Sequence, residues 1–164
     1  MKEYTSIQTI IGKLYIVIED ERIVAIHMGE EDFLQSENPS HMTNNRNHPL
    51  LNEASRQLQE YLSGNRSEFD LPLKVEGTEF QMKVWKQLQS IPYGKTSSYQ
   101  DVAVAIGNEK AVRAIGQANK ANRLPIIIPC HRVIGKNQTL TGYAGKRINI
   151  KEELLLIEGA PFKK

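Results

Sequence analysis

A single cysteine, Cys130, precedes a histidine, His131, in the segment Ile-Ile-Ile-Pro-Cys-His-Arg-Val-Ile-Gly that spans residues 126–135. The three isoleucines predict a short buried strand or the wall of an apolar turn, and the proline interrupts any regular strand there. Burial raises the pKa of a thiol above about 8.5, so a buried cysteine reacts only when a base can take its proton. Histidine is such a base, directly or through a water molecule. A lone cysteine is also a common small core residue, so catalysis and packing both stay open on this segment alone.

The composition limits what kind of protein can surround this pair. The 164 residues fit one domain or two small ones, and 40% hydrophobic with 24% charged residues predicts a soluble protein with a proper core. One cysteine excludes an intrachain disulfide and favours a reducing compartment. The single cysteine and four histidines also lack the close Cys/His spacing of a structural zinc site. The apolar runs are too short for a membrane span, and no apolar stretch follows the first residues as in a signal peptide. We therefore expect a cytoplasmic protein with no resident metal.

The net charge of +2 is not the signature of a strongly basic nucleic-acid-binding protein, but the charges are unevenly distributed. Acidic residues gather in the first 32 positions, whereas Lys and Arg outnumber Asp and Glu between residues 83 and 151. Any contact with nucleic acid is therefore expected in the C-terminal half.

The N-terminal half has the pattern of a small α/β domain. Alternating apolar residues predict a hairpin and a third strand, followed by a polar loop, an amphipathic helix that ends near Gly64, and a short strand. In order, these elements are expected at residues 4–11, 13–19, 22–28, 30–49, 50–62 and 68–73. Residues 74–77 are the predicted linker, which gives an N-terminal domain over residues 1–76.

The C-terminal half, residues 77–164, has the pattern of a mostly helical domain. Thr78 and Gln81 form a predicted capping box for a helix whose Trp85 is expected in the core. Two helices, over residues 98–106 and 110–121, are separated by a glycine turn, which is the outline of a helix-turn-helix. A last helix is expected from about residue 149 to Glu158, where a glycine follows.

The second helix of this pair has two different faces. Its apolar positions, with Asn119, are expected to face the core, while the opposite arc combines small residues with long basic ones. The outward residues are Arg113, Ala114, Gln117, Lys120 and Ala121. Such a face could approach DNA closely, and it could equally be an ordinary solvated surface.

Several motifs together resemble one family. The heptapeptide Pro-Cys-His-Arg-Val-Ile-Gly, with Asn122 eight residues before the cysteine, closely resembles the active-site signature of the O6-alkylguanine-DNA alkyltransferases. The resemblance extends through Ile91-Pro92-Tyr93-Gly94, Tyr99-Gln100, Arg113-Ala114-Ile115-Gly116 and Leu154-Leu155-Leu156-Ile157-Glu158-Gly159. It implies an α+β protein: a small ribonuclease H-like α/β domain followed by a mostly helical, winged-helix-like domain that contains the helix-turn-helix.

The resemblance also implies a reaction. Members of this family move the alkyl group of O6-alkylguanine, and in some cases of O4-alkylthymine, irreversibly onto their own cysteine, which is Cys130 here. His131 would draw off the thiol proton through water, and Glu158 would support the resulting imidazolium, as in a Ser-His-Asp triad. On sequence alone Glu152 and Glu153 compete with Glu158, and the glycine after Glu158 favours the latter. The reaction needs no cofactor and gives one turnover per molecule.

The resemblance further implies how double-stranded DNA would be bound by a monomer. Arg113 would fill the gap left by a flipped nucleotide, with the face formed by Ala114, Gly116, Gln117 and Lys120 in the minor groove. Tyr99 would help to rotate the phosphate and would hydrogen-bond the flipped base, and Asn122 would brace the active-site turn. The base pocket would be formed by Tyr99, Val133, Tyr143, Ala144 and Gly145.

Two departures from the family pattern affect these expectations. Arg123 stands where many members have proline, and Lys146-Arg147 follows Gly145 in place of a more usual Gly-Gly pair, which leaves the shape of the pocket rim open.

Two other functions are also consistent with single motifs. A non-catalytic damage-sensing or helix-turn-helix module would not need the Cys130–His131–Glu158 set, and a thiol hydrolase would need an oxyanion hole and multiple turnovers.

Overall fold

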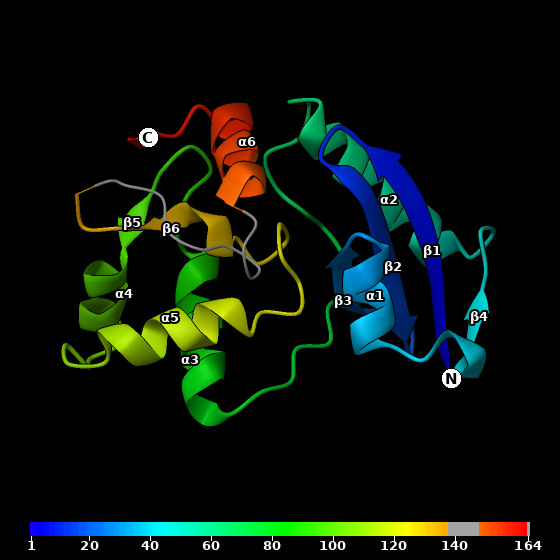
Figure 1. Cartoon of the computed structure of the whole chain (residues 1–164), viewed down its shortest axis with the longest axis horizontal. Helices are drawn as coiled ribbons and strands as arrows, with labels where there is room; N and C mark the ends of the chain where they lie inside the picture. Colours follow the sequence, from blue (N-terminus) through cyan, green and yellow to red (C-terminus); the bar gives the residue numbers. More distant parts are fainter. Residues whose placement is uncertain (138–147, 164) are drawn as a thin grey trace. The chain divides into compact units, whose positions relative to one another are not determined.

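The computed structural model describes residues 1–137 and 148–163 of the chain. It forms two compact units, Met1–Val75 and Glu76–Lys164, each with its own secondary structure (Figure 1). The first unit is built on a sheet and the second is mainly helical, so the predicted mixed α+β class is confirmed.

The sheet of the first unit has four strands in the order β3-β2-β1-β4. The strands β1 (Lys2–Thr9), β2 (Gly12–Glu19) and β3 (Arg22–Met28) form an antiparallel meander, as the alternating pattern predicts. The short strand β4 (Met42–Asn44) adds to the free side of β1 in parallel orientation. Turns at Gly12 and at Asp20-Glu21, all with positive φ, reverse the chain between the long strands.

Helices cover both faces of this sheet (Figure 1). Tyr15 of β2 stacks on Phe33 of α1 (Glu30–Ser36), with ring centroids 4.2 Å apart. The alternate residues of β2, which point the other way, are also buried, and there α2 (Pro49–Leu62) packs against β1 and β2. The predicted stripe of α2 is buried, so this helix is placed as its periodicity indicates.

The prediction of one long loop over residues 30–49 is wrong. This segment contains α1, a 3₁₀ turn (η1, Pro39–His41) and β4. The short helix is stabilised by tertiary contacts that a polar pattern does not reveal: Phe33 is buried, and the Asp32 carboxylate accepts the Met28 amide at 3.0 Å. Glu37 then joins the helix end to His27 of β3, with 2.8 Å between its Oε2 and the imidazole Nε2.

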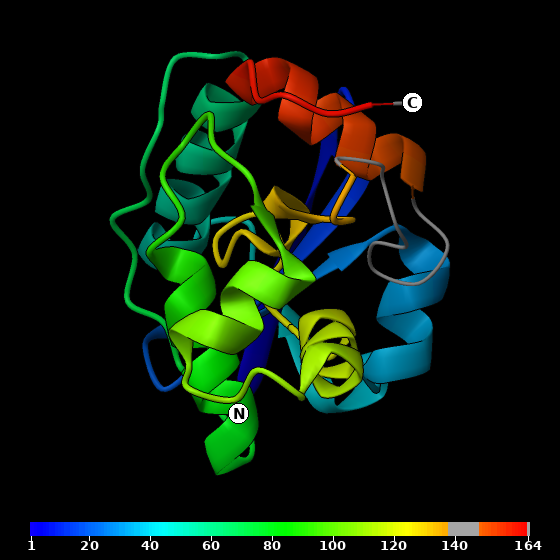
Figure 2. The same ribbon diagram turned by 90° about the vertical axis from the view of Figure 1, so that its left-hand side faces the viewer.

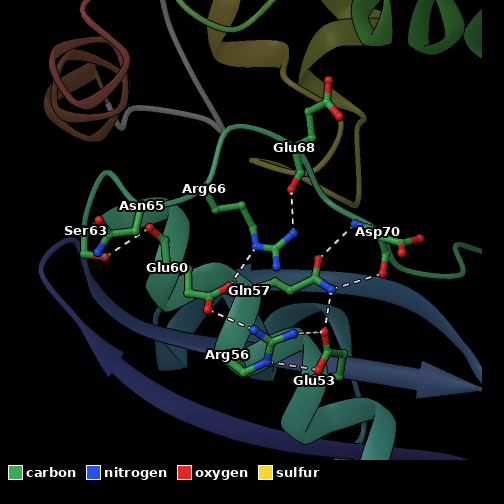
Figure 3. Close-up of polar contacts among 9 residues, drawn as sticks. All are labelled: Glu53, Arg56, Gln57, Glu60, Ser63, Asn65, Arg66, Glu68 and Asp70. Carbon is green, nitrogen blue, oxygen red and sulfur yellow. Dashed lines mark hydrogen bonds and ion pairs between the residues drawn. The ribbon is translucent and has the colours of Figure 1, made fainter.

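The predicted strand over residues 68–73 is also wrong, because only Leu73 forms an isolated bridge, to Ile23. Side chains satisfy the backbone instead (Figure 3). The buried Gln57 amide donates to the Asp70 carbonyl at 3.1 Å and accepts the Asp70 amide at 2.9 Å, and Arg66 donates to the Glu68 carbonyl at 3.0 Å. These bonds to α2 and its following turn replace a strand ladder.

The second unit contains four helices in its described part, with a small two-stranded sheet between them. The helices are α3 (Glu79–Gln89), α4 (Tyr99–Ala105), α5 (Val112–Lys120) and α6 (Ile148–Glu158). The strands β5 (Ser97–Ser98) and β6 (Val133–Ile134) pair in parallel. The 3₁₀ turn η2 (Cys130–Arg132) precedes β6 and contacts both α3 and α6.

The helices α3 and α4 begin where their caps predict, whereas α5 begins at Val112, two residues after its predicted start, and has no side-chain cap. Thr78 and Ser98 both form capping boxes, with Gln81 and Asp101 respectively. Trp85 of α3 is a core residue, as expected, and its indole N–H donates to the Ala118 carbonyl of α5 at 2.9 Å. The pair α4 and α5 lies side by side in both views (Figures 1 and 2), so the predicted helix-turn-helix is present. No helix in the described part of the chain is long and apolar enough to cross a membrane.

Candidate functional site

The cysteine follows a tight turn and not a strand. Within this turn Ile126 has φ of 76°, a conformation that costs a β-branched residue on the order of 1–3 kcal/mol. Asn122 stabilises the turn from within: its Nδ2 donates to the Ile128 carbonyl at 2.9 Å, and its Oδ1 accepts the Leu124 amide at 2.9 Å. Of the two predicted alternatives for the isoleucine run, the apolar turn is therefore correct.

Cys130 is almost completely buried, with 3% of its surface exposed. Its carbonyl accepts a hydrogen bond from Nδ2 of Asn119 at 3.3 Å. Asn119 lies on the inner side of α5, as the helix periodicity predicts, but its bond to the cysteine turn was not foreseen. The bond ties the turn directly to the helix whose outer face carries Arg113.

His131 is the next residue of η2, and its side chain is completely buried. Its Nε2 lies 2.7 Å from Oε2 of Glu158, which ends α6. Burial lowers the pKa of His131 below its usual range, although the hydrogen bond and charge of Glu158 oppose that shift. The structure thus places Glu158 against the histidine, while Glu153 is exposed and Glu152 half-buried.

Glu158 also has a partner that the sequence did not suggest. The guanidinium of Arg132 binds both carboxylate oxygens, with Nε 2.9 Å from Oε1 and Nη2 3.0 Å from Oε2. Its third nitrogen, Nη1, donates to the Ile91 carbonyl at 2.7 Å. The only sequence signal was an arginine next to the Cys-His pair, which could equally have been a surface residue or a DNA contact.

Lys151 is the second residue that the sequence reading missed. It is completely buried, and its Nζ donates to the Val133 carbonyl at 2.6 Å. Desolvation lowers the pKa of Lys151 to about 8, while the charge of Cys130 acts in the opposite direction. The signal was available in the helix pattern, because Lys151, Leu154, Leu155 and Glu158 form one buried stripe at the spacing of an amphipathic helix.

The pairing of β5 with β6 positions the predicted tyrosine. Ser97 pairs with Val133 and Ser98 with Ile134, so Tyr99, which follows Ser98 and begins α4, starts beside the strand that leaves the cysteine turn. The Tyr99 side chain is half-buried. The other predicted pocket residues, Tyr143, Ala144 and Gly145, lie outside the described residues, as do Lys146 and Arg147 of the expected pocket rim.

The outer face of α5 matches its predicted pattern. Arg113, Ala114, Gln117 and Lys120 are exposed, and Gly116 is half-buried with no atom within 4 Å of where a Cβ would stand. Ile115 and Asn119 face inward, whereas Val112, also expected inside, is 37% exposed because it begins the helix. The role of this face in DNA binding stays a prediction.

The described residues contain no group of three or more His, Cys, Asp or Glu side chains arranged to hold a metal ion. Near Cys130 the described residues bring together a carboxylate, an imidazole, a guanidinium and an amine, from Glu158, His131, Arg132 and Lys151. Such a set can move a proton and stabilise charge beside a thiol.

Both units match models of one protein family. Residues 2–75 match the ribonuclease-like domain of 6-O-methylguanine DNA methyltransferase, and residues 79–160 match its DNA binding domain. This chain belongs to the 6-O-methylguanine DNA methyltransferase family. The resemblance stated from the motifs is therefore confirmed, and the match covers the N-terminal unit as well.

Relatives of this family member align over nearly its whole length. It is 50% identical over 163 residues to the constitutive methylated-DNA–protein-cysteine methyltransferase of Bacillus subtilis, covering 99% of both chains. The crystal structure of Mycobacterium tuberculosis O6-methylguanine methyltransferase superimposes with a TM-score of 0.87 at 41% identity, over 98% of this chain and 96% of the other. A structure of the M. tuberculosis protein in complex with DNA gives a TM-score of 0.85 at 40% identity, over 97% and 95% of the two chains.

The buried amine of this family member gives a stability prediction. Because the pKa of Lys151 falls from 10.5 when unfolded to about 8 when folded, the unfolded state binds more protons between these values, and stability rises with pH there. We expect the free energy of unfolding of the wild type, relative to Lys151→Met, to rise by about 2 kcal/mol between about pH 8 and pH 10. Urea titrations of both proteins across this range measure it. A pH-independent difference would show that the amine is not desolvated.

Proposed function

We propose that this chain is a DNA repair protein that transfers the alkyl group of O6-alkylguanine in double-stranded DNA to the sulfur of Cys130. The observation that carries the proposal is the buried Cys130 turn, followed by a His131 that is hydrogen-bonded to Glu158, in a chain that aligns end to end with a methylated-DNA–protein-cysteine methyltransferase. A thiol in this setting has an adjacent base, and the base has an acid that orients it.

The reaction is a displacement at the alkyl carbon. His131 takes the thiol proton through a water molecule, the sulfur–carbon bond forms, and the bond between that carbon and the guanine oxygen breaks. The departing guanine is protonated by the Tyr99 hydroxyl or by water. The product is a stable thioether, and no described group near Cys130 offers a way to remove the alkyl group, so each molecule acts once. O4-alkylthymine has an analogous exocyclic oxygen and is a second candidate substrate.

The buried sulfur can reach such a base only if the nucleotide leaves the duplex, at a cost of a few kcal/mol. We assign this step to α5, placed in the minor groove, where the small side chains of Ala114 and Gly116 permit close approach. Arg113 then fills the gap in the stack, while Gln117 and Lys120 contact the backbone. All these residues lie in the unit Glu76–Lys164, which carries both DNA binding and alkyl transfer.

The geometry around Cys130 also suggests how a flipped base is held. Asn119 and Lys151 donate hydrogen bonds to the carbonyls of Cys130 and Val133, and these bonds hold both carbonyls in place. A carbonyl oxygen is the acceptor that the exocyclic amine of guanine requires, so we assign these two carbonyls to its recognition. Tyr99 supplies a hydroxyl donor from the neighbouring α4, and Asn122 keeps the turn in place.

We further propose that the protein acts as a monomer in the cytoplasm, where one cysteine remains reduced.

The two alternative functions are less well supported. A thiol hydrolase would leave the small, basic outer face of α5 without a use, and it would turn over repeatedly. A non-catalytic sensor of alkylated DNA would not need a cysteine beside the His131–Glu158 pair.

The acceptor role of Cys130 can be tested by mass. We expect incubation with an oligonucleotide that contains O6-methylguanine to add one methyl group per molecule of wild-type protein, because the thioether is not turned over. Intact-protein mass spectrometry before and after incubation measures the gain. Cys130→Ala should gain nothing while keeping the same thermal unfolding profile, and an unchanged mass in folded wild-type protein would refute the proposal.

The role of Arg113 separates base flipping from chemistry. Arg113→Ala should lower the rate of repair of an alkylated duplex by about tenfold or more, because nothing fills the emptied stack. The rate with free O6-benzylguanine should stay within about twofold of wild type, since a free base needs no flipping. Arg22→Ala, which removes an exposed arginine from the other unit, is the charge-matched control. Equal losses with both substrates would contradict the stack-filling role.

A further inference from the structure

Arg132 is held more firmly than an ordinary partner of a carboxylate. Its guanidinium makes three hydrogen bonds, two to Glu158 and one to the Ile91 carbonyl, and it lies 5.8 Å from the ring centre of Tyr93. Only 10% of its side chain is exposed. A planar guanidinium can fork onto both oxygens of a carboxylate at once, which a lysine amine cannot do.

Four donors converge on the Glu158 carboxylate. Oε1 accepts hydrogen bonds from Nε of Arg132 and from the backbone amide of Gly94, the latter at 3.2 Å. Oε2 accepts from Nη2 of Arg132 and lies against Nε2 of His131. A carboxylate surrounded in this way acts purely as an acceptor. The histidine must therefore present a proton on Nε2, and the lone pair of the neutral ring must be on Nδ1.

The charge of Arg132 matters as much as its geometry. Three charged groups act on the His131 ring: Glu158 and Lys151 from α6, and Arg132 from η2. Cys130 is the residue directly before His131 in the chain. Glu158 favours the imidazolium, whereas both cations and the burial of the ring oppose it. Without the guanidinium, the buried Glu158 carboxylate would lose its bidentate partner while still lying 2.7 Å from the imidazole, and the pKa of the ring would rise.

We propose that Arg132 is a positioning residue for alkyl transfer: its forked contact with Glu158 keeps His131 neutral, with the proton on Nε2 and the accepting lone pair on Nδ1. The inference rests on the proposed function, in which His131 draws the proton from Cys130. It assigns Arg132 a role through Glu158 and no contact with the substrate.

The test compares two substitutions at this position. Arg132→Gln removes the charge but retains a donor, and Arg132→Lys retains the charge but removes the fork. Single-turnover rates with free O6-benzylguanine are measured as a function of pH, because the rate falls at low pH when His131 becomes protonated. We expect the acidic limb of the pH–rate profile of Arg132→Gln to move about one pH unit or more towards higher pH. Arg132→Lys should keep the acidic limb of the wild type, with a plateau rate about tenfold lower.

A structural role alone would lower both plateaus and leave both limbs in place, and that result would overturn the proposal. If Arg132→Gln does not fold, Arg132→Lys decides: a wild-type plateau would refute the requirement for the fork. An NMR titration of the His131 ring in wild type and variants gives the same comparison without any alkyl transfer. A shifted ring titration in a protein that transfers no alkyl group would uphold the effect of Arg132 on His131 while rejecting the proposed function.

Discussion

The second unit of this protein depends on one buried carboxylate. Glu158 ends α6 with its side chain completely inside the protein, where an uncompensated negative charge would be strongly unfavourable. Two separate segments supply its donors: the turn at Gly94, and η2 through His131 and the forked guanidinium of Arg132. When one partner of such a buried pair is removed, the remaining charge typically costs about 3–5 kcal/mol. The carboxylate therefore fixes the relative positions of these segments.

A second set of contacts, separate from those of Glu158, holds the turn that carries the proposed acceptor cysteine. Asn119 and Asn122 fix the backbone around Cys130, while Lys151 occupies one lone pair of the Val133 carbonyl. These residues come from α5, from the turn after it and from α6, so packing of the helices sets the geometry around the Cys130 side chain. The site is built on rigid elements with a strained turn at its centre, and this arrangement favours a defined orientation of the sulfur and the imidazole.

Sequence patterns identified the elements of this site better than its contacts. Periodicity and capping residues were sufficient for the meander, for α2 and for α3, because each depends on local propensity and a single buried face. The helix α1 was missed because tertiary contacts, among them Phe33 on Tyr15 and Glu37 on His27, stabilise a polar segment. Arg132 and Lys151 were missed for a related reason: a charged residue is assumed to be exposed until a buried partner is known, and the partners lie 18 or more residues away. The motif resemblance supplied Glu158, which spacing alone could not choose over its neighbours.

The most direct test of this account is the single-turnover rate of alkyl transfer in Glu158→Gln, measured on protein whose folding is verified by the fluorescence of the buried Trp85. Glutamine has nearly the same shape, but it carries no charge and directs an N–H₂ group towards either His131 or Arg132, so the four donors can no longer be satisfied. The account predicts a rate about 100-fold or more below that of the wild type. A folded Glu158→Gln protein that reacts within about twofold of the wild-type rate would contradict it.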